Sequence, residues 1–526
     1  MVGSVPRSRC SASVRGHLLP RRWPQIRSSR SHPFKGRDGC LDNAPMTGNP
    51  DAVVIGSGPN GLAAAITLAA AGLSVIVLEA HTSIGGGTRT AELTIPGLRH
   101  DHCAAVHPLA VASPYLRTLP LDSYGLRWRW PEIDLAHPLD NGRAVLLARS
   151  VTATASGLGA DSSTWERLFS PLVDSFDQLA AEVLGPALHR PRHPGALASF
   201  ALRAGLPAQG IIGLLRTEPA KALFAGIAAH GAHPLERPAT AAIGVVLAAA
   251  GQQSGWPVAE GGSARITDAL AAILLASGGR VETGVAVTDL AEIPPSLAIL
   301  LDTSPAAADR IAGDRLPVAI RRAYKRWRYG PAAFKLDLAV EGGVPWTAEP
   351  CRRAATVHVG GTASEIAKAE SDVHHGRLPA RPFVLVAQQY LCDPGRSSGD
   401  VHPVWAYAHV PHGYPGDASG LVLDQIERFA PGLRERIVGS RATPPADLEA
   451  YDANYVGGDI ATGANSLRQL LFRPRVTAHP YDTGIPGVYL CSAATPPGAG
   501  VHGMCGHLAA RRALSRLRLP LDPVGG

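Results

Sequence analysis

The sequence predicts a two-domain α/β protein, and three observations support this fold class. Its 526 residues exceed what one compact core usually holds, since domains run about 100–200 residues. A strand–glycine loop–helix–strand unit occupies residues 51–80, and a second glycine-rich loop opens a helix near residues 498–518. Between them, residues 330–411 contain strand-like runs without long helices between them. We therefore expect one domain built on a parallel sheet and a second built on an antiparallel one.

Positive charge is concentrated in residues 1–45, which carry eight Arg and one Lys against Asp38 and Asp42. This excess equals the formal net charge of +7 for the whole chain, so the remainder offers no basic face for nucleic acid. The segment is Arg- and Ser-rich, as in an organelle transit peptide. The bias of Arg over Lys favours a bacterial gene, with residues 1–45 a mis-assigned start before Met46 or a disordered extension. We expect a cytoplasmic protein, or a mitochondrial one if the segment is a true transit peptide.

Cysteine spacing and hydropathy exclude other classes of protein. The seven cysteines show no C-x-x-C pair and no zinc spacing, so we expect free thiols, no metal site and no thiol–disulfide chemistry. No window approaches the roughly 18–20 uninterrupted apolar residues of a membrane span.

The run DAVVIGSGPNGLAAAITLAAAGLSVIVLEA, from Asp51, predicts a dinucleotide site. A short apolar strand leads into G-x-G-x-x-G, formed by Gly56, Gly58 and Gly61, and a helix then leads to a second strand ending at Glu79. The glycines permit a tight turn, close approach to a pyrophosphate and close helix–strand packing, while the helix N-terminus offers N–H groups to phosphate. Glu79 can accept hydrogen bonds from ribose hydroxyls and would repel a 2′-phosphate, which disfavours NADP. The strand–helix–strand context makes this short motif specific.

The loop after Glu79 favours FAD over NAD. In AHTSIGGGTRT, the glycines Gly85, Gly86 and Gly87 are followed closely by Arg89. A plain NAD domain would continue into another helix, whereas a flavoprotein uses such a loop to bring backbone and a cation near its cofactor. The alternative for Arg89 is a solvated surface arginine. The sequence contains no second G-x-G-x-x-G with its strand and acid, so we expect one bound dinucleotide, FAD.

The blocks GSGPNGLAAA, VLEA and GGGTRT resemble the phytoene desaturase (carotenoid dehydrogenase) type of flavoprotein. The similarity is greatest to the related branch that includes pyridine nucleotide-disulphide oxidoreductase domain-containing protein 2, although the cysteines do not support the disulfide chemistry of that name. The resemblance spans roughly residues 50–518 and is strongest at both ends and around 255–290. It implies a Rossmann-like FAD/NAD(P)-binding domain of the glutathione reductase/amine oxidase type, with a discontinuous α+β substrate domain.

The same resemblance divides the chain. The FAD-binding domain is expected from residues 50–130, 251–320 and 470–526, and the substrate domain from residues 131–250 and 321–469. Around residues 258–290 the chain would return to the FAD domain through a helix over 264–276, with the Val287 backbone touching the adenine.

The interior of the chain gives weaker indications. Residues 210–258 are apolar on more than one face, which is typical of buried helices or of the lining of an apolar substrate cavity or a membrane-touching rim. His230 is expected to be a core histidine with its hydrogen bonds satisfied. Lys335 and Asp337 share a strand face by the period of two, and a surface ion pair is the favoured interpretation.

The run GVYLCSAATPPGAGVHGMCGHLAARRAL resembles the closing signature of the family, in which a strand runs into a glycine loop and a helix. A helix N-terminus aimed at the pyrimidine side of a flavin would stabilise the negative charge of the reduced ring. Gly498, Gly500, Gly503 and Gly506 would let the backbone lie against that ring. Cys505 is expected to be a small buried thiol.

Three residues are candidates for catalysis. His502, in the closing loop, could be a proton acceptor or a flavin contact. Tyr455 and Asp459, in the segment YDANYVGGDI, are the other two, with turn-stabilising hydrogen bonds as their alternative role. The candidates for cofactor binding come from both ends of the chain and from its return segment: Gly56, Gly58, Pro59, Asn60, Gly61, Glu79, Ala80, Gly86, Gly87, Arg89, Val287, Gly500, Val501, His502, Gly503 and Met504.

The resemblance implies an FAD-dependent oxidoreductase of the desaturase or dehydrogenase type, which moves a hydride from an apolar, polyene or lipid-like substrate to flavin N5. The expected partners are that small molecule and a peripheral membrane contact, without nucleic acid. The electron acceptor stays open among oxygen, a quinone and a nicotinamide nucleotide. Two alternatives stay open as well: a flavin amine oxidase, and a non-catalytic lipid- or flavin-binding protein of the same fold.

Overall fold

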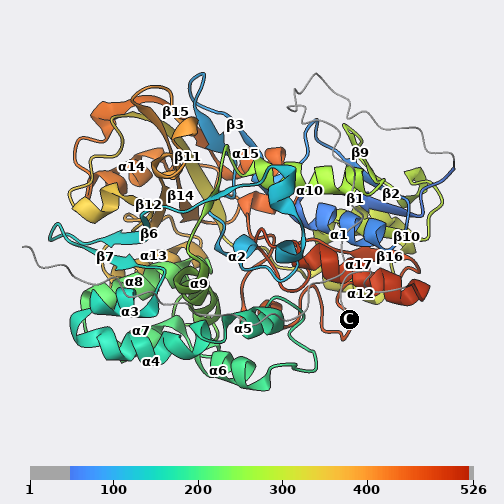
Figure 1. Ribbon diagram of the computed structural model, residues 1–526, viewed down its shortest axis with the longest axis horizontal. Coiled ribbons are helices and arrows are strands. Elements are labelled where there is room, and N and C mark those ends of the chain that lie inside the picture. Colours follow the sequence, from blue (N-terminus) through green and yellow to red (C-terminus); the bar gives the residue numbers. More distant parts are fainter. Residues whose placement is uncertain (1–47, 520–526) are drawn as a thin grey trace, which may run out of the picture.

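The computed structural model describes residues 48–519 and places them around two β-sheets (Figure 1). The predicted extension at residues 1–45 and the last residues of the 470–526 segment lie outside the described residues. One sheet is parallel and the other is mixed, which gives the α/β architecture predicted from the sequence.

The parallel sheet lies on the right in Figure 1. Its five strands, in spatial order, are β16 (Val488–Leu490), β10 (Ala298–Leu301), β1 (Ala52–Ile55), β2 (Val75–Glu79) and β9 (Arg280–Thr283). They come from the three segments expected to form the FAD-binding domain. Because β1 and β10 run parallel with Ile55 opposite Leu301, the residues that follow these two strands meet at one edge of the sheet.

Helices α1 (Pro59–Ala70), α10 (Ala264–Ala276) and α17 (Met504–Leu517) pack around this sheet. The bounds of α10 agree with the helix predicted over residues 264–276. Helix α17, the last helix of the chain, lies beside α1 (Figure 1). Gly506 permits this approach, since a Cβ there would lie 1.7 Å from the backbone oxygen of Asn60. The first and last glycine motifs of the sequence are therefore neighbours in space.

The second sheet has seven strands, and all of them lie in the segments expected to form the substrate domain. Their spatial order is β15 (Ile437–Thr443), β11 (Ala332–Glu341), β14 (Val401–Val410), β13 (Val384–Ala387), β12 (Ala354–Val359), β6 (Ile133–Pro138) and β7 (Ala144–Leu147). The four strands predicted within residues 330–411 are present and antiparallel to one another, but β12 pairs with β6 in parallel.

One expectation for this region is wrong. The 12-residue helix α13 (Ala363–His374) lies between β12 and β13, where no long helix was expected. A reciprocal pair of hydrogen bonds between Thr362 and Glu365 begins this helix, and the spacing T-x-x-E carries the signal for it.

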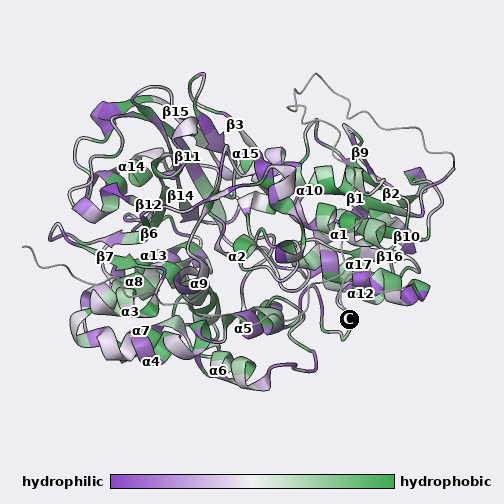
Figure 2. Cartoon of the chain, viewed as in Figure 1, coloured by the Kyte–Doolittle hydropathy of each residue, from purple (hydrophilic) through white to green (hydrophobic). Residues whose placement is uncertain are grey.

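A layer of helices lies below the seven-stranded sheet in the view of Figure 1. It consists of α3 (Val151–Ser156), α4 (Ser162–Val173), α5 (Phe176–Val183), α6 (Pro194–Ala204), α7 (Ala208–Leu214), α8 (Glu218–Ala229) and α9 (Ala241–Ser254). Helices α8 and α9 are buried on nearly every side, and α9 is coloured mostly hydrophobic in Figure 2. Among the described residues, no single helix is long and apolar enough to cross a membrane. The pair α6–α7 has the length and composition for this only when both helices are taken together, and it is bent by 89°.

Short elements connect these layers. They are β3 (Thr90–Glu92), β4 (Arg99–Asp101), α2 (Pro108–Val111), β5 (Trp128–Arg129), β8 (Val258–Ala259), α11 (Pro305–Ala312), α12 (Val318–Lys325), α14 (Ser419–Glu427), α15 (Pro445–Tyr451) and α16 (Leu467–Leu471).

Arg396 ties three of the connecting segments together. Its guanidinium is fully buried, pairs with Asp101 and Asp393, and donates to the Ala259 carbonyl at 2.8 Å. Asp101 in turn accepts the Ser263 amide at 2.7 Å. This cluster holds the start of α10 and the segment after β13 in fixed relation.

Candidate functional site

A cavity of about 1340 Å³ joins the glycine loops of the parallel sheet to the inner face of the seven-stranded sheet. The residues at its two ends come from β1, β2 and the closing loop on one side, and from α9, β12, β13 and β14 on the other. Most of the predicted cofactor-binding residues line this cavity; the exceptions are Gly61, Gly503 and Met504.

The first glycine loop has the geometry that its motif predicts. Gly56 has φ +100°, a value that favours glycine. Gly61 lies behind the loop, and a Cβ there would lie 2.0 Å from the Gly56 carbonyl oxygen, so its role is close packing. Gly58 faces the second glycine loop, because a Cβ on Gly86 would lie 3.2 Å from the Cα of Gly58. The two loops thus present backbone to the same part of the cavity.

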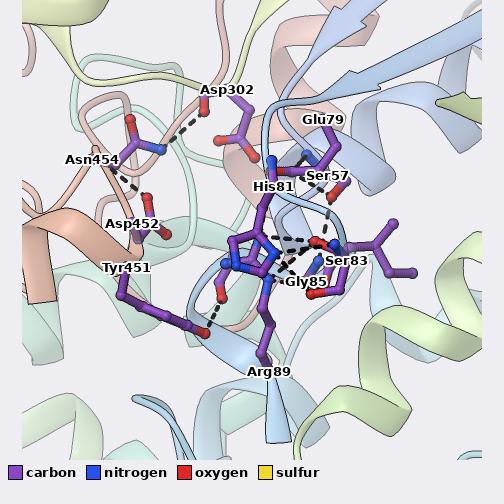
Figure 3. Close-up of polar contacts among 12 residues, drawn as sticks. Ser57, Glu79, His81, Ser83, Gly85, Arg89, Asp302, Tyr451, Asp452 and Asn454 are labelled. Atoms are coloured by element: carbon purple, nitrogen blue, oxygen red, sulfur yellow. Dashed lines mark hydrogen bonds and ion pairs between the residues drawn. The ribbon is translucent and has the colours of Figure 1, made fainter. Parts of the chain in front are cut away.

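Glu79 is held in place by the first loop. Its Oε2 accepts from the Ser57 amide at 2.9 Å and the Ser57 hydroxyl at 2.6 Å, and its Oε1 accepts from the His81 amide at 2.8 Å (Figure 3). The carboxylate also lines the cavity. Its position at the end of β2 is the one predicted for a ribose-binding acid, with Ser57 as a partner that the motif alone does not reveal.

Arg89 is buried, so its alternative as a solvated surface arginine is wrong. Its Nη2 lies 3.3 Å from Glu79 Oε1 and donates to the Ser83 carbonyl at 3.0 Å, and its Nε donates to the carbonyls of Ser83 and Ile84. The side chain lines the cavity, and its guanidinium lies 5.2 Å from the centroid of the Tyr451 ring. Arg89 therefore offers positive charge at the bottom of a glycine-lined pocket, which suits a phosphate.

Asp302 is a site residue that the sequence analysis missed. It follows β10, and its Oδ2 accepts the Gly61 amide of α1 at 2.8 Å. A Cβ on Gly58 would lie 3.0 Å from the same oxygen, so the carboxyl stands directly behind the first loop. Burial raises the pKa of Asp302 to about 8. The only signal in the sequence is its place immediately after a strand that pairs with β1.

The segment after α15 covers the loops. The Tyr451 hydroxyl donates to the Gly86 carbonyl at 2.8 Å, and Asn454 bridges the Asp302 carbonyl and the Ser304 amide (Figure 3). Tyr455 packs its hydroxyl on Gly87, where a Cβ would lie 1.9 Å from that oxygen. The segment therefore reaches the cofactor loops from the substrate-domain part of the chain.

The three catalytic candidates occupy different settings. Tyr455 and His502 line the cavity, and Asp459 does not. Asp459 is buried and accepts the amides of Gly330 at 2.7 Å and Ala461 at 2.9 Å, which is the turn-stabilising role named as its alternative. Burial raises the pKa of Tyr455 well above its ordinary value.

His502 is also buried, and its Nδ1 accepts the Met504 amide at 3.1 Å at the start of α17. Burial lowers its pKa to about 4, so the ring is neutral at pH 7 and acts as a hydrogen-bonding group. It comes within reach of the cavity together with Gly500 and Val501.

The other closing glycines serve packing within the protein. A Cβ on Gly498 would lie 2.3 Å from the Arg473 guanidinium, and one on Gly503 would lie 3.0 Å from the Cβ of Ala63. Gly498, Gly503 and Gly506 do not line the cavity, whereas Gly500 does, and contact of the closing loop with a flavin stays a prediction. Cys505 is a buried thiol with its pKa raised to about 12 by burial, as expected.

The other half of the cavity is mostly apolar. Leu385 and Tyr407 reach it from the seven-stranded sheet, and Ile243 and Val246 reach it from α9. Of the two interpretations of residues 210–258, the structure therefore supports both: the helices are buried, and one of them lines the cavity.

His230 differs from the satisfied core histidine that was expected. Its Nε2 lies 3.0 Å from the Nε2 of His358. The ring lines the cavity and packs edge-on against Trp256, with 5.4 Å between the ring centroids. No hydrogen bond from Nδ1 to another described residue is present.

The pair Lys335–Asp337 is not on the surface. Both side chains are fully buried on β11 and form an ion pair, and Asp337 Oδ1 lies 3.4 Å from the His100 ring. The period of two correctly placed both residues on one strand face. Strand β4, which carries His100, lies against that face, and the pattern of β11 alone does not reveal this cover.

The site fits a dinucleotide cofactor. Two glycine loops expose backbone to one cavity, Arg89 adds charge beside them, and the buried Asn60 Oδ1 has no partner among the described residues. Val287 lines the cavity beyond β9, as the resemblance implied for a residue next to an adenine.

This fold and site define a protein with a Rossmann-like dinucleotide-binding domain of the flavoprotein type. A family model for the NAD(P)-binding Rossmann-like domain matches residues 54–119. The solved cyclohexylamine oxidase of Brevibacterium oxydans has the same fold, with a TM-score of 0.55, 17% identity, and coverage of 90% of this chain and all of that one. The predicted fold class is confirmed.

The chain is similar to pyridine nucleotide-disulfide oxidoreductase domain-containing protein 2 of Rattus norvegicus, with 26% identity over 93% of this chain and 95% of that protein. A shorter match is to the lycopene-forming phytoene desaturase of Pseudescherichia vulneris, with 33% identity over 16% of each chain. The resemblance drawn from the glycine motifs is thereby confirmed. These findings support an oxidoreductase that uses a flavin or nucleotide cofactor.

Proposed function

We propose that the protein is an FAD-dependent oxidoreductase of the dehydrogenase or desaturase type that acts on an apolar, polyene or lipid-like substrate. The observation that carries this proposal is the single cavity in which dinucleotide-binding loops open directly into an apolar chamber. A nucleotide-binding module without a reaction partner needs no such chamber.

The residues of the first loop, with Arg89, would hold the pyrophosphate, and Glu79 would meet a ribose. Val287 would contact the adenine, and Gly500, Val501 and His502 would lie at the opposite end of the cofactor. When bound, FAD supplies a hydride acceptor at its N5 atom.

The chain itself excludes water and orients the substrate. Tyr407, Leu385 and the α9 side chains Ile243 and Val246 form apolar walls, so a bound hydrocarbon would displace water from the chamber. His502 and Tyr455 are two of the polar residues that line the cavity, and both are neutral at pH 7. They are suited to hydrogen bonding rather than to ion pairing with a charged substrate.

The mouth of the cavity suits entry from a lipid surface. Leu467 and Leu471 of α16 line the cavity and are each 43% exposed, and Leu202 of α6 is 75% exposed beside cavity-lining Ala201. We propose that this rim contacts membranes peripherally. Phosphatidylglycerol vesicles should co-sediment with the protein, and Leu202→Asp together with Leu471→Asp should abolish co-sedimentation while FAD content stays unchanged; retention by the double variant would contradict the contact.

The proposed function is tested by flavin content and anaerobic reduction. The purified protein should be yellow or take up added FAD, and its flavin absorbance should bleach anaerobically with polyene or lipid substrates. Protein that binds no FAD would overturn the proposal in favour of a non-catalytic binding protein. Bleaching by amines alone would replace it with an amine oxidase. Reoxidation of the bleached protein by oxygen, a quinone or NAD⁺ identifies the acceptor.

A further inference from the structure

The wall of the cavity opposite α9 has a polar stripe across the seven-stranded sheet. His358 of β12 stands opposite Leu385 of β13, which stands opposite Tyr407 of β14. Thr356 lies two residues before His358, so both side chains project from the same face of the sheet. Thr356, Leu385 and Tyr407 line the cavity, and His358 contacts it through His230.

This stripe holds more polar atoms than the protein satisfies. Thr356 Oγ1 and Trp405 Nε1 are buried without a partner among the described residues, and so are the Nδ1 atoms of His358 and His137. Unpaired buried polar groups are costly, and a cluster of them in an apolar cavity marks a place for a polar ligand group. No set of three or more His, Cys, Asp or Glu side chains in residues 48–519 could hold a metal ion, so the histidines are not a metal site.

Hydrogen bonding fixes the position of the proton on His137. The His137 Nε2 lies 2.7 Å from the Gly361 carbonyl, which can only accept, so His137 carries its proton there and its Nδ1 is bare. The Nδ1 atoms of His137 and His358 both face Gly226, where a Cβ would lie 3.2 and 2.9 Å from them. No hydrogen bond links these two Nδ1 atoms. We place the proton of His358 on Nδ1 as part of the proposal, because two lone pairs would otherwise point at the same glycine.

The proton position on His358 determines which hydrogen-bonding group His230 presents to the cavity. With its proton on Nδ1, His358 accepts at Nε2 from the Nε2–H of His230, at 3.0 Å. Burial lowers the pKa of His230 to about 3 and that of His137 to about 4, so the rings are neutral. A neutral His230 protonated on Nε2 presents a bare Nδ1, which is a hydrogen-bond acceptor.

We propose that His230, held by His358, is the polar subsite of the cavity and accepts a hydrogen bond from a hydroxyl group at one end of an otherwise apolar substrate. The inference rests on the proposed function and narrows its substrate class from hydrocarbons to alcohols. Tyr407 approaches Cys103 near the second glycine loop, and His358 lies two strands beyond it. Strands are spaced by about 4.8 Å, so His358, which holds the subsite, lies roughly 10 Å from Tyr407 across the sheet.

The test compares two probes that differ in one hydrogen-bond donor, retinol and retinyl methyl ether. Binding to the FAD-loaded protein is followed by retinoid fluorescence. The wild-type protein should bind retinol about tenfold more tightly than the ether, the value of one buried hydrogen bond. His230→Phe should abolish this preference by weakening retinol alone, and His230→Gln, which keeps an acceptor oxygen, should restore part of it.

His233→Phe is the matched control. His233 lies three residues further on, packs against His374 with 5.0 Å between ring centroids, and does not line the cavity. It should leave the preference unchanged. Equal affinity of the wild-type protein for both probes, or an unchanged preference in His230→Phe, would overturn the inference. Neither result depends on turnover, whereas failure to bind FAD would overturn the proposed function alone.

Discussion

Among single residues, Asp302 is the part of the candidate cofactor site that was least expected from the sequence. It accepts the Gly61 amide at the amino end of α1, where a phosphate-binding helix would otherwise keep its N–H groups free. Its pKa of about 8 results from burial, and the nearby carboxylates Asp452 and Glu79 raise it further. The group is therefore protonated at neutral pH and adds no negative charge beside a pyrophosphate.

Asp302→Asn tests this protonation through stability. In the unfolded chain the pKa is about 3.9, so between about pH 4 and pH 8 the folded protein holds a proton that the unfolded chain has lost. Stability from this group is full below pH 4, falls as pH rises, and levels off above pH 8. In urea unfolding of the FAD-free protein, the variant should lose less stability than the wild type between pH 5 and pH 8.

The exposed Asp122→Asn variant serves as the control for this experiment and should follow the wild type. A wild-type loss between pH 5 and pH 8 equal to that of Asp302→Asn would show that Asp302 ionises normally.

Gly61→Ala tests the close packing of the first loop. The added Cβ would lie 2.0 Å from the Gly56 carbonyl oxygen, which is backbone and cannot move aside. We expect a loss of about 1–3 kcal/mol in the free energy of unfolding together with loss of bound FAD. Gly213→Ala in α7, with open space around its Cβ, should change stability by no more than about 1 kcal/mol. Retention of FAD by Gly61→Ala at wild-type affinity would contradict this role.

Residues of the contiguous motifs were predictable, and residues brought together by strand pairing were not. Gly56, Gly58 and Glu79 lie within one strand–helix–strand unit whose spacing carries its own geometry. Asp302 lies 241 residues from Gly61 and reaches it only because β10 pairs with β1. The pattern of a single strand does not identify the strand beside it, so Asp302 could not be placed in the site from its local sequence.

At the scale of the element, β11 shows the same limit. Its alternation placed Lys335 and Asp337 on one face, and this is confirmed. Which face is covered depends on strand β4, which carries His100 and lies over two hundred residues earlier in the chain. The ion pair that was expected on the surface is therefore buried. Removal of one partner should cost much more free energy of unfolding than it would in a surface pair.

Lys335→Met should destabilise the protein by about 3–5 kcal/mol, because it leaves the Asp337 carboxylate buried without its main counter-charge. Lys335→Met combined with Asp337→Leu should recover most of that loss, since no charge then remains unpaired. Chemical denaturation measures both. A loss below about 1 kcal/mol in the single variant, typical of surface pairs, would show that the pair is solvated.

At the scale of the whole molecule, buried polar contacts of Arg396 hold together segments that are far apart in the sequence. Its partners Asp101 and Asp393 come from segments on either side of the junction. Because the guanidinium is fully buried and charge-paired, the contact is directional and holds one relative position of the joined segments.

Arg396→Met should lower the free energy of unfolding by about 3–5 kcal/mol through the unpaired Asp101 and should weaken FAD retention, because the start of α10 is held by the same carboxylate. The nearby pair Arg129–Glu260 is half exposed, and Arg129→Met should leave the free energy of unfolding nearly unchanged. Equal effects of the two variants would show that Arg396 does not hold the junction.

The placement of β16 and α17 has a consequence for how the protein is made. The central strand β1 comes early in the chain, yet β10 stays without its outer neighbour until β16 is synthesised, and α1 lacks its partner helix until α17 follows. A ribosome therefore releases most of the polypeptide before the pocket begun at Gly56 can close. Loading of the proposed cofactor is therefore expected late in biosynthesis, and until then the half-built parallel sheet leaves apolar surface uncovered.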